Sequence, residues 1–184
     1  MAVTSIEDLF VNELRDIYSA EKQLTRALPR MAKAAKHPEL RDAFESHLEE
    51  TRGQIERLDQ VFEQLDLAKR AKKCEAMEGL IEEAREQMEE LADKAVLDVG
   101  MIISAQKVEH YEIAGYGSLV ALAKQLGHQE VAGLLAETLD EEKAADQKLN
   151  KIAASVNAEA AETGPSERKD QPGRGAKTRA RSPG

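Results

Sequence analysis

Glutamate residues stand where helical periodicity calls for apolar side chains. Glu21 lies between Ile17 and Leu24 in a stripe of apolar residues at steps of three and four. Because burial of an unpaired carboxylate is costly, we expect Glu21 to be paired, protonated or bound to a metal ion. Glu112 follows Glu21 by 91 residues and lies one helical turn from Glu109. Inward-facing glutamates of this kind are the ligands of di-iron carboxylate proteins.

Two further segments add potential ligands. His47, Glu50 and Gln54 follow one another at spacings of three and four, and Glu141 and Glu142 are adjacent in a later segment. Glu142 is nearer the centre of its apolar stripe, but the sequence leaves open which of the two points inward. Converging carboxylates would repel one another in an apolar interior, and two divalent cations, iron or manganese, would relieve that repulsion. The predicted metal ligands are therefore Glu21, His47, Glu50, Glu109, Glu112, Glu141 and Glu142.

One feature departs from the usual di-iron pattern. Gly53 and Ala144 follow Glu50 and Glu141 by three residues, where a Glu-x-x-His motif would place histidine. His47 instead precedes Glu50 by three residues. The alternative interpretation is a non-catalytic helical homodimer, in which the interior acids are structural charges paired with lysine and arginine.

Four long helices are expected to position these residues. Apolar stripes predict helices over about 4–36, 40–65, 92–126 and 131–156, with Pro29 kinking the first or removing one of its hydrogen bonds. His37-Pro38 and Gly127-His128 mark tight turns, and a crossover of about 25 residues joins the two hairpins. A weaker helical segment is expected to start near Glu75, either as a short extra helix in the crossover or merging into the next helix. A single long crossover is typical of ferritin-like bundles, so the predicted fold is an all-α antiparallel four-helix bundle of that kind.

The two halves of the chain also repeat. A shift of 91 residues aligns Glu21 with Glu112 and Glu50 with Glu141, and it superimposes the two tight turns. This pattern indicates an internal duplication, with a pseudo-twofold axis between the hairpins and the acids facing one another at mid-height.

The remaining reactive side chains receive structural interpretations. Cys74 is the single cysteine and lies in a basic segment, where we expect a surface thiol without function. Tyr18, Tyr111 and Tyr116 are expected to fill the core or an interface. Tyr18 is also a candidate partner for the site, since it lies one turn from Glu21.

Charge divides the chain into two parts. The sequence has 35 acidic and 26 basic residues and a net charge of −9. Residues from 165 onward carry +4 and no large apolar side chain, so we predict a bundle over 1–160 and a disordered basic tail over 161–184. The acidic bundle excludes specific nucleic acid as its ligand, whereas the tail could make weak nonspecific DNA contact. No apolar run predicts a membrane span or a secretory signal, so a cytoplasmic location is expected.

Several segments together resemble a known family. The runs YSAEKQL (18–24), HLEETRGQ (47–54), QKVEHYEIA (106–114), CEAMEGLIEE (74–83) and LDEEKA (139–144) are similar to the YciE/YciF-type family of bacterial ferritin-like proteins. The resemblance covers about residues 4–157. It implies a ferritin-like bundle, a homodimer and an association with stress responses, and it supports the metal ligands named above. It supplies no reaction, although such a metal pair could act on oxygen or peroxide.

Overall fold

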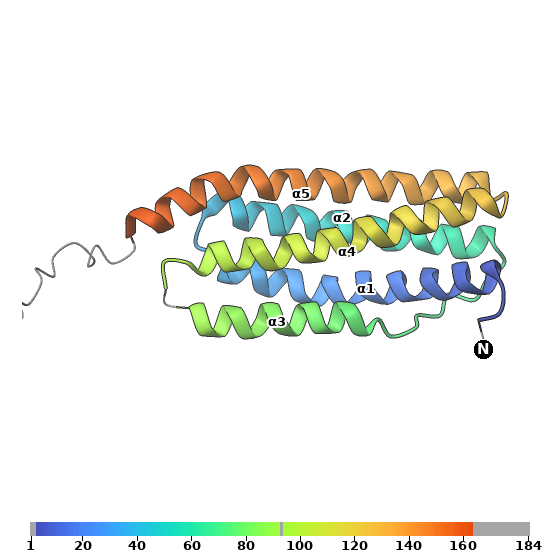
Figure 1. Ribbon diagram of the computed structural model, residues 1–184, viewed down its shortest axis with the longest axis horizontal. Helices are drawn as coiled ribbons and strands as arrows, with labels where there is room; N and C mark the ends of the chain where they lie inside the picture. Colours follow the sequence, from blue (N-terminus) through green and yellow to red (C-terminus); the bar gives the residue numbers. More distant parts are fainter. Residues whose placement is uncertain (1–2, 93, 164–184) are drawn as a thin grey trace, which may run out of the picture.

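Five α-helices account for most of the chain. The computed structural model describes residues 3–92 and 94–163, and within these ranges there is no strand. The helices are α1 (Ile6–Ala34), α2 (Pro38–Gln64), α3 (Glu75–Leu91), α4 (Leu97–Gln125) and α5 (Gln129–Thr163). Helices α1 and α2 form one antiparallel hairpin and α4 and α5 the other, as Figure 1 shows. The predicted all-α fold is confirmed.

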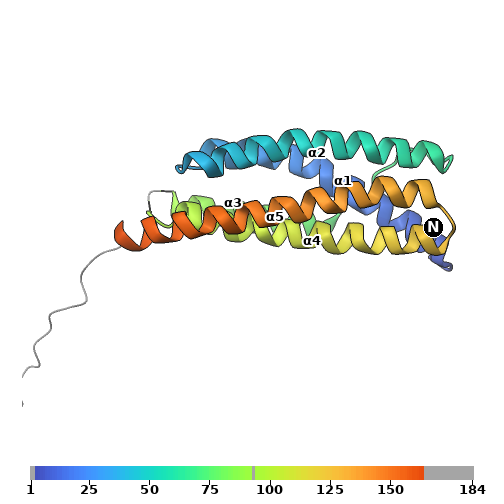
Figure 2. The ribbon, with the colours of Figure 1, turned by 90° about the horizontal axis from the view of Figure 1, so that it is seen from above.

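The two hairpins join into one four-helix bundle. Helix α1 packs on α2, α2 on α5, α5 on α4 and α4 on α1, which closes the ring. Helix α2 ends at the opposite end of the bundle from the start of α4, so the connection runs the whole length (Figure 1). Seen from above, the α1–α2 hairpin lies beside the α4–α5 hairpin (Figure 2). The end-to-end crossover expected of a ferritin-like bundle is therefore present.

The crossover contains a short extra helix, as one of the two expectations for this segment had it. Helix α3 ends at Leu91 and α4 begins at Leu97, so the segment starting near Glu75 does not merge with the next helix. Helix α3 packs against α1 and α4. At Gly100 of α4, an added Cβ would lie only 2.7 Å from Leu91 Cδ1, so the glycine allows this close approach. No helix in the described ranges is both long enough and apolar enough to cross a membrane.

Local signals set the helix ends. Ser5 and Asp8 form a capping box at the start of α1, and Pro38 occupies the first turn of α2. Gly127 has a φ of +82°, the left-handed conformation that ends α4 and starts the turn to α5. Pro29 lies on the exposed side of α1, and the helix continues past it. Helix α5 extends to Thr163, slightly past the boundary predicted at 160, and the predicted tail beyond it lies outside the described residues.

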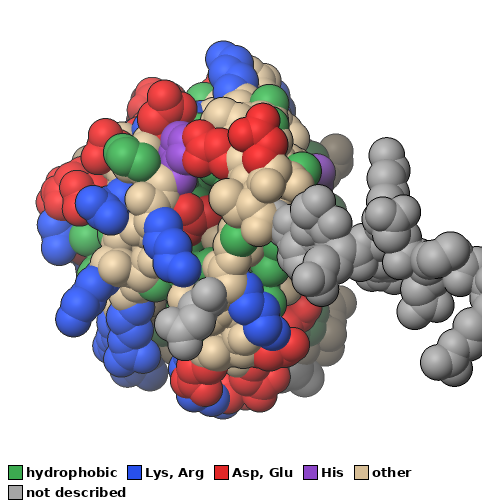
Figure 3. Space-filling model, turned by 90° about the vertical axis from the view of Figure 1, so that its left-hand side faces the viewer, with side chains coloured by type: hydrophobic (Ala, Val, Ile, Leu, Met, Phe, Trp, Pro, Cys, Tyr) green, Lys and Arg blue, Asp and Glu red, His purple; other side chains and the backbone are tan. Residues whose placement is uncertain are grey.

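A buried aspartate on α4 caps the turn between α1 and α2. Asp98 Oδ1 accepts a hydrogen bond from the Lys36 backbone N–H at 3.0 Å, and Oδ2 accepts one from His37 N–H at 2.6 Å. These donors would otherwise be unsatisfied at the start of α2. The end of the bundle that carries this turn shows interspersed acidic and basic side chains, with hydrophobic surface only in small separate areas (Figure 3).

We expect Asp98→Ala to destabilise the bundle, because two backbone N–H groups lose their acceptor. The free energy of unfolding should fall by about 1–3 kcal/mol. Urea denaturation followed by circular dichroism measures this change. Asp140→Ala is the control, since Asp140 is exposed and forms its ion pair with Lys143 on its own helix. An equal effect of both substitutions would contradict the capping role.

Candidate metal centre

Four buried side chains from three helices converge inside the bundle. His47 comes from α2, Glu109 and Glu112 from successive turns of α4, and Glu142 from α5. Each offers one ligand atom, and these four atoms all lie within 4.8 Å of one another. Ligands around one cation at about 2.1 Å lie about 3–4 Å apart, so a small contraction would produce a coordination shell. We call these four residues the central cluster.

Most oxygens of this region have no protein partner. Six buried carboxylate oxygens of Glu21, Glu109, Glu112 and Glu142 lack a hydrogen-bond partner, as does His47 Nε2. His47 Nε2 lies 3.5 Å from Glu109 Oε1 and 3.9 Å from Glu142 Oε2. Among residues 3–92 and 94–163, no lysine or arginine forms an ion pair with these four glutamates. Acceptors left unsatisfied in an apolar interior are destabilising, and a cation would satisfy them.

Burial and mutual repulsion shift the protonation of the cluster. Burial raises the pKa of Glu21 and that of Glu142 to about 7, and nearby glutamates add to the shift. Burial and neighbouring carboxylates also hold the pKa values of Glu109 and Glu112 well above their usual range. Burial favours the neutral form of the His47 imidazole and so lowers its pKa. The nearby carboxylates of Glu109, Glu50 and Glu142 outweigh this effect and raise the pKa of His47 to about 10. The metal-free site thus holds protons that a cation would displace.

Glu21 lies beside the central cluster and is held by a tyrosine from α4. Its carboxylate is fully buried, and Oε1 accepts a short hydrogen bond from the Tyr116 hydroxyl. Glu21 raises the pKa of Glu112 through its charge, so the two carboxylates are neighbours. The sequence predicted only a filling role for Tyr116. The signal that could have identified it is its spacing of four residues from Glu112, on the same inward face.

We expect Tyr116→Phe to destabilise the metal-free protein, because it removes the hydroxyl that donates to the buried Glu21 carboxylate. The loss should be about 1–3 kcal/mol in the free energy of unfolding. Chemical denaturation in the presence of a chelator measures it. Tyr18→Phe is the matched control: Tyr18 donates to Asp59 rather than to Glu21, and the Asp59 side chain is 34% exposed. A larger loss in the control would show that the Tyr116 hydroxyl contributes little.

The structure does not place Glu50 and Glu141 in the central cluster. Glu50 has 44% of its side chain exposed, and its Oε2 lies 3.3 Å from His47 Nδ1. Glu141 accepts two hydrogen bonds from the Arg57 guanidinium, at 2.7 and 3.0 Å, and one from Gln54. Glu142 is the inward residue of its pair, which decides the alternative that the sequence left open. Of the seven predicted ligands, the structure brings together His47, Glu109, Glu112 and Glu142, with Glu21 adjacent to them.

Cys74 is buried, not a surface thiol as predicted. It occupies the N-cap of α3, and its Sγ lies 2.9 Å from the Tyr111 hydroxyl, which donates to Asp16 at 2.7 Å. Burial and the nearby Asp16 raise the pKa of the thiol, so the neighbouring basic residues do not activate it. The crossover folds Cys74 inward because its backbone N–H donates to Ser19 of α1.

Comparison with known proteins places the chain in a family. A family model described as a domain of unknown function (DUF892) matches residues 5–162. The chain is also 56% identical over 154 residues to Protein YciF of Escherichia coli (strain K12). This match covers 83% of this chain and 93% of that protein. The chain belongs to this family. The resemblance to YciE/YciF-type proteins that the sequence motifs indicated is thereby confirmed.

Solved structures of similar proteins share the same fold. The crystal structure of the E. coli stress protein YciF matches with a TM-score of 0.81 and 54% identity, covering 84% of this chain and 98% of that one. YcfI of Rhodopseudomonas palustris, described as a candidate structural protein, matches with a TM-score of 0.80 and 51% identity, covering 82% of this chain and 96% of that one. A protein from Xanthomonas campestris matches with a TM-score of 0.67 and 27% identity, covering 85% of this chain and 96% of that one.

Proposed function

We propose that this DUF892 protein binds metal ions inside its bundle. The observation that carries the proposal is the set of six buried carboxylate oxygens without partners, which lie beside an imidazole and form no ion pair with a lysine or arginine of the described ranges. Bound cations would supply the missing partners. One ion would lie among His47, Glu109, Glu112 and Glu142, and Glu21 would join Glu112 in holding a second.

The donor set favours iron or manganese. Carboxylate oxygens with a single imidazole suit divalent manganese and iron, and the absence of cysteine ligands argues against a structural zinc site. When bound, such ions supply redox chemistry toward oxygen or peroxide. The protein's own residues would hold the ions and would release the protons that the metal-free site carries.

The relatives suggest the context in which the site works. The E. coli relative is named a stress protein, and this chain is more than half identical to it. We infer a role for this chain in a stress response through the same buried site. The homodimer and the nonspecific DNA contact of residues 161–184 stay predictions, and most of that tail lies outside the described residues.

Adjacent glutamates on α5 provide a direct test of the proposed site. We expect Glu142→Gln to lower the affinity for Mn(II) or Fe(II) at least about tenfold, because it removes a buried negative ligand. Glu141→Gln should leave the affinity nearly unchanged, since Glu141 already pairs with Arg57. Equilibrium dialysis of the full chain with metal analysis measures both.

The outcome separates metal binding from the structural alternative. If the parent protein binds neither Mn(II) nor Fe(II), the interior acids are simply protonated groups of a helical scaffold, and the proposal fails. If Glu141→Gln and Glu142→Gln weaken binding equally, the ions bind at the surface rather than in the central cluster.

A further inference from the structure

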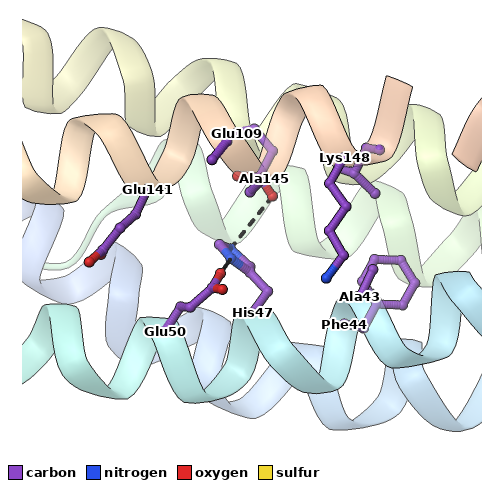
Figure 4. Close-up of a pocket in the computed structure, with 10 residues that line it drawn as sticks. Ala43, Phe44, His47, Glu50, Glu109, Glu141, Ala145 and Lys148 are labelled. Carbon is purple, nitrogen blue, oxygen red and sulfur yellow. Dashed lines mark hydrogen bonds and ion pairs between the residues drawn. The ribbon is translucent and has the colours of Figure 1, made fainter. Parts of the chain in front are cut away.

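A cavity connects the surface of the bundle with the central cluster. It lies between α2 and α5, has a volume of about 170 Å³, and is lined at its inner end by His47 and Glu109 (Figure 4). Both of these side chains are more than nine-tenths buried, and His47 Nε2 and Glu109 Oε2 have no hydrogen-bond partner. The cavity therefore ends on two unsatisfied ligand atoms.

We propose that this cavity is the passage by which divalent cations travel from solvent to the buried cluster, with Glu50 as the outer carboxylate that first receives the ion. This inference rests on the proposed function. It adds the route by which the ion reaches the central cluster, and it assigns to Lys148 the control of the rate of entry. Neither feature is specified by the metal ligands or by the fold.

Small side chains create the space for this passage. Ala145 on α5 and Ala43 on α2 line the cavity, together with Phe44 and Leu149. A volume of about 170 Å³ is several times what one water molecule needs, so a cation can enter with part of its hydration shell. Helix α3 packs on α1 and α4, so a fifth helix covers that other side of the bundle.

Charges at the mouth are arranged to receive a cation. Glu50 is exposed to solvent, while its Oε2 touches His47 Nδ1, so this carboxylate lies next to a side chain of the cluster. Glu141 also lines the cavity, but Arg57 neutralises it.

Lys148 is the opposing charge at the same mouth. It is exposed on α5 and lines the cavity, and Figure 4 shows its side chain extending toward α2. Lys148 and Glu50 line the same cavity, and charges interact over about 10 Å at 0.1 M salt. Lys148 therefore competes with an arriving cation for Glu50 and slows its passage.

The experiment measures the rate and the extent of Co(II) uptake by the metal-free full chain, using stopped-flow absorbance. We expect Ala145→Leu to slow uptake about tenfold, equivalent to about 1.4 kcal/mol of added barrier, with the same amount bound at equilibrium. Ala154→Leu, at an exposed position of the same helix, is the control. Lys148→Met should accelerate uptake, most strongly at low salt, whereas Lys124→Met at the far end of α4 should not.

The rate of uptake tests the passage, whereas the amount of Co(II) bound at equilibrium tests the metal site. Slower uptake with Ala145→Leu and faster uptake with Lys148→Met, at unchanged equilibrium binding, support the passage. If the parent binds Co(II) but both variants take it up at the parental rate, the passage is wrong and the metal site stands. If the parent binds no Co(II) at equilibrium, the metal site itself is wrong and the passage falls with it.

Discussion

Replacing Glu109, Glu112 and Glu142 together by glutamine is expected to make the metal-free protein more stable and to abolish its stabilisation by metal. The substitution keeps the side-chain shape but removes three buried acids that repel one another and lack partners. The parent, in contrast, gains RT ln(1 + [L]/Kd) from bound metal, about 2.7 kcal/mol at a hundredfold excess over Kd. For a chain of this size, that gain raises the melting temperature by about 5–11 °C.

Thermal unfolding of both proteins, with chelator and with Mn(II), measures these shifts. The matched control replaces Glu49, Glu137 and Glu141 by glutamine, since these acids are at least partly exposed or paired with arginine. The control should keep the metal-dependent rise. A triple cluster variant that melts below the parent in chelator would show that the acids stabilise the interior as charges, and the structural alternative would replace the metal site.

The metal-free protein is expected to lose stability as the pH rises from about 5 to about 8. Burial raises the folded-state pKa of Glu21 and Glu142 from 4.5 to about 7, so the folded protein binds more protons than the unfolded chain between these values. Stability therefore falls as the pH rises through that window. His47 adds to the trend in the same direction. Because its pKa is raised on folding, its protonation stabilises the folded state fully below pH 6.5, and this stabilisation is lost as the pH rises toward about 10.

Melting temperature against pH in the presence of a chelator tests this dependence, and we expect a fall of about 10 °C across the window. Saturating Mn(II) should reverse the slope, because the metal displaces protons and binds more tightly as they leave. The Glu109→Gln, Glu112→Gln, Glu142→Gln variant provides the control, with a flatter profile. A parental profile that is flat or rises with pH in chelator would contradict the raised pKa values.

Periodicity alone located the acids that matter most. Glu21 and Glu112 interrupt apolar stripes at equivalent positions of the two halves, and both are fully buried at the centre of the bundle. Turn residues at 37–38 and 127–128, with one long connection, were enough to predict two hairpins and their end-to-end crossover. These features are local or follow from chain length, so the sequence determines them directly.

Side-chain direction within a turn was decided only by the tertiary structure. The repeat predicted Glu50 and Glu141 as symmetric ligands, but neither joins the central cluster. Glu141 is one residue, about 100° of helix rotation, from the inward Glu142, and it pairs with Arg57. Glu50 is three residues, about 60° of rotation, from His47, and 44% of its side chain is exposed. The 91-residue repeat aligns three residues of the central cluster with residues that are not metal ligands: His47 with Thr138, Glu109 with Tyr18 and Glu142 with Thr51. The central cluster therefore does not follow the pseudo-twofold axis. Tyr116 bonding Glu21 and the cavity beside Ala145 arise between helices distant in sequence. Packing across the bundle selects which carboxylates lose their water, and no single helix encodes that choice.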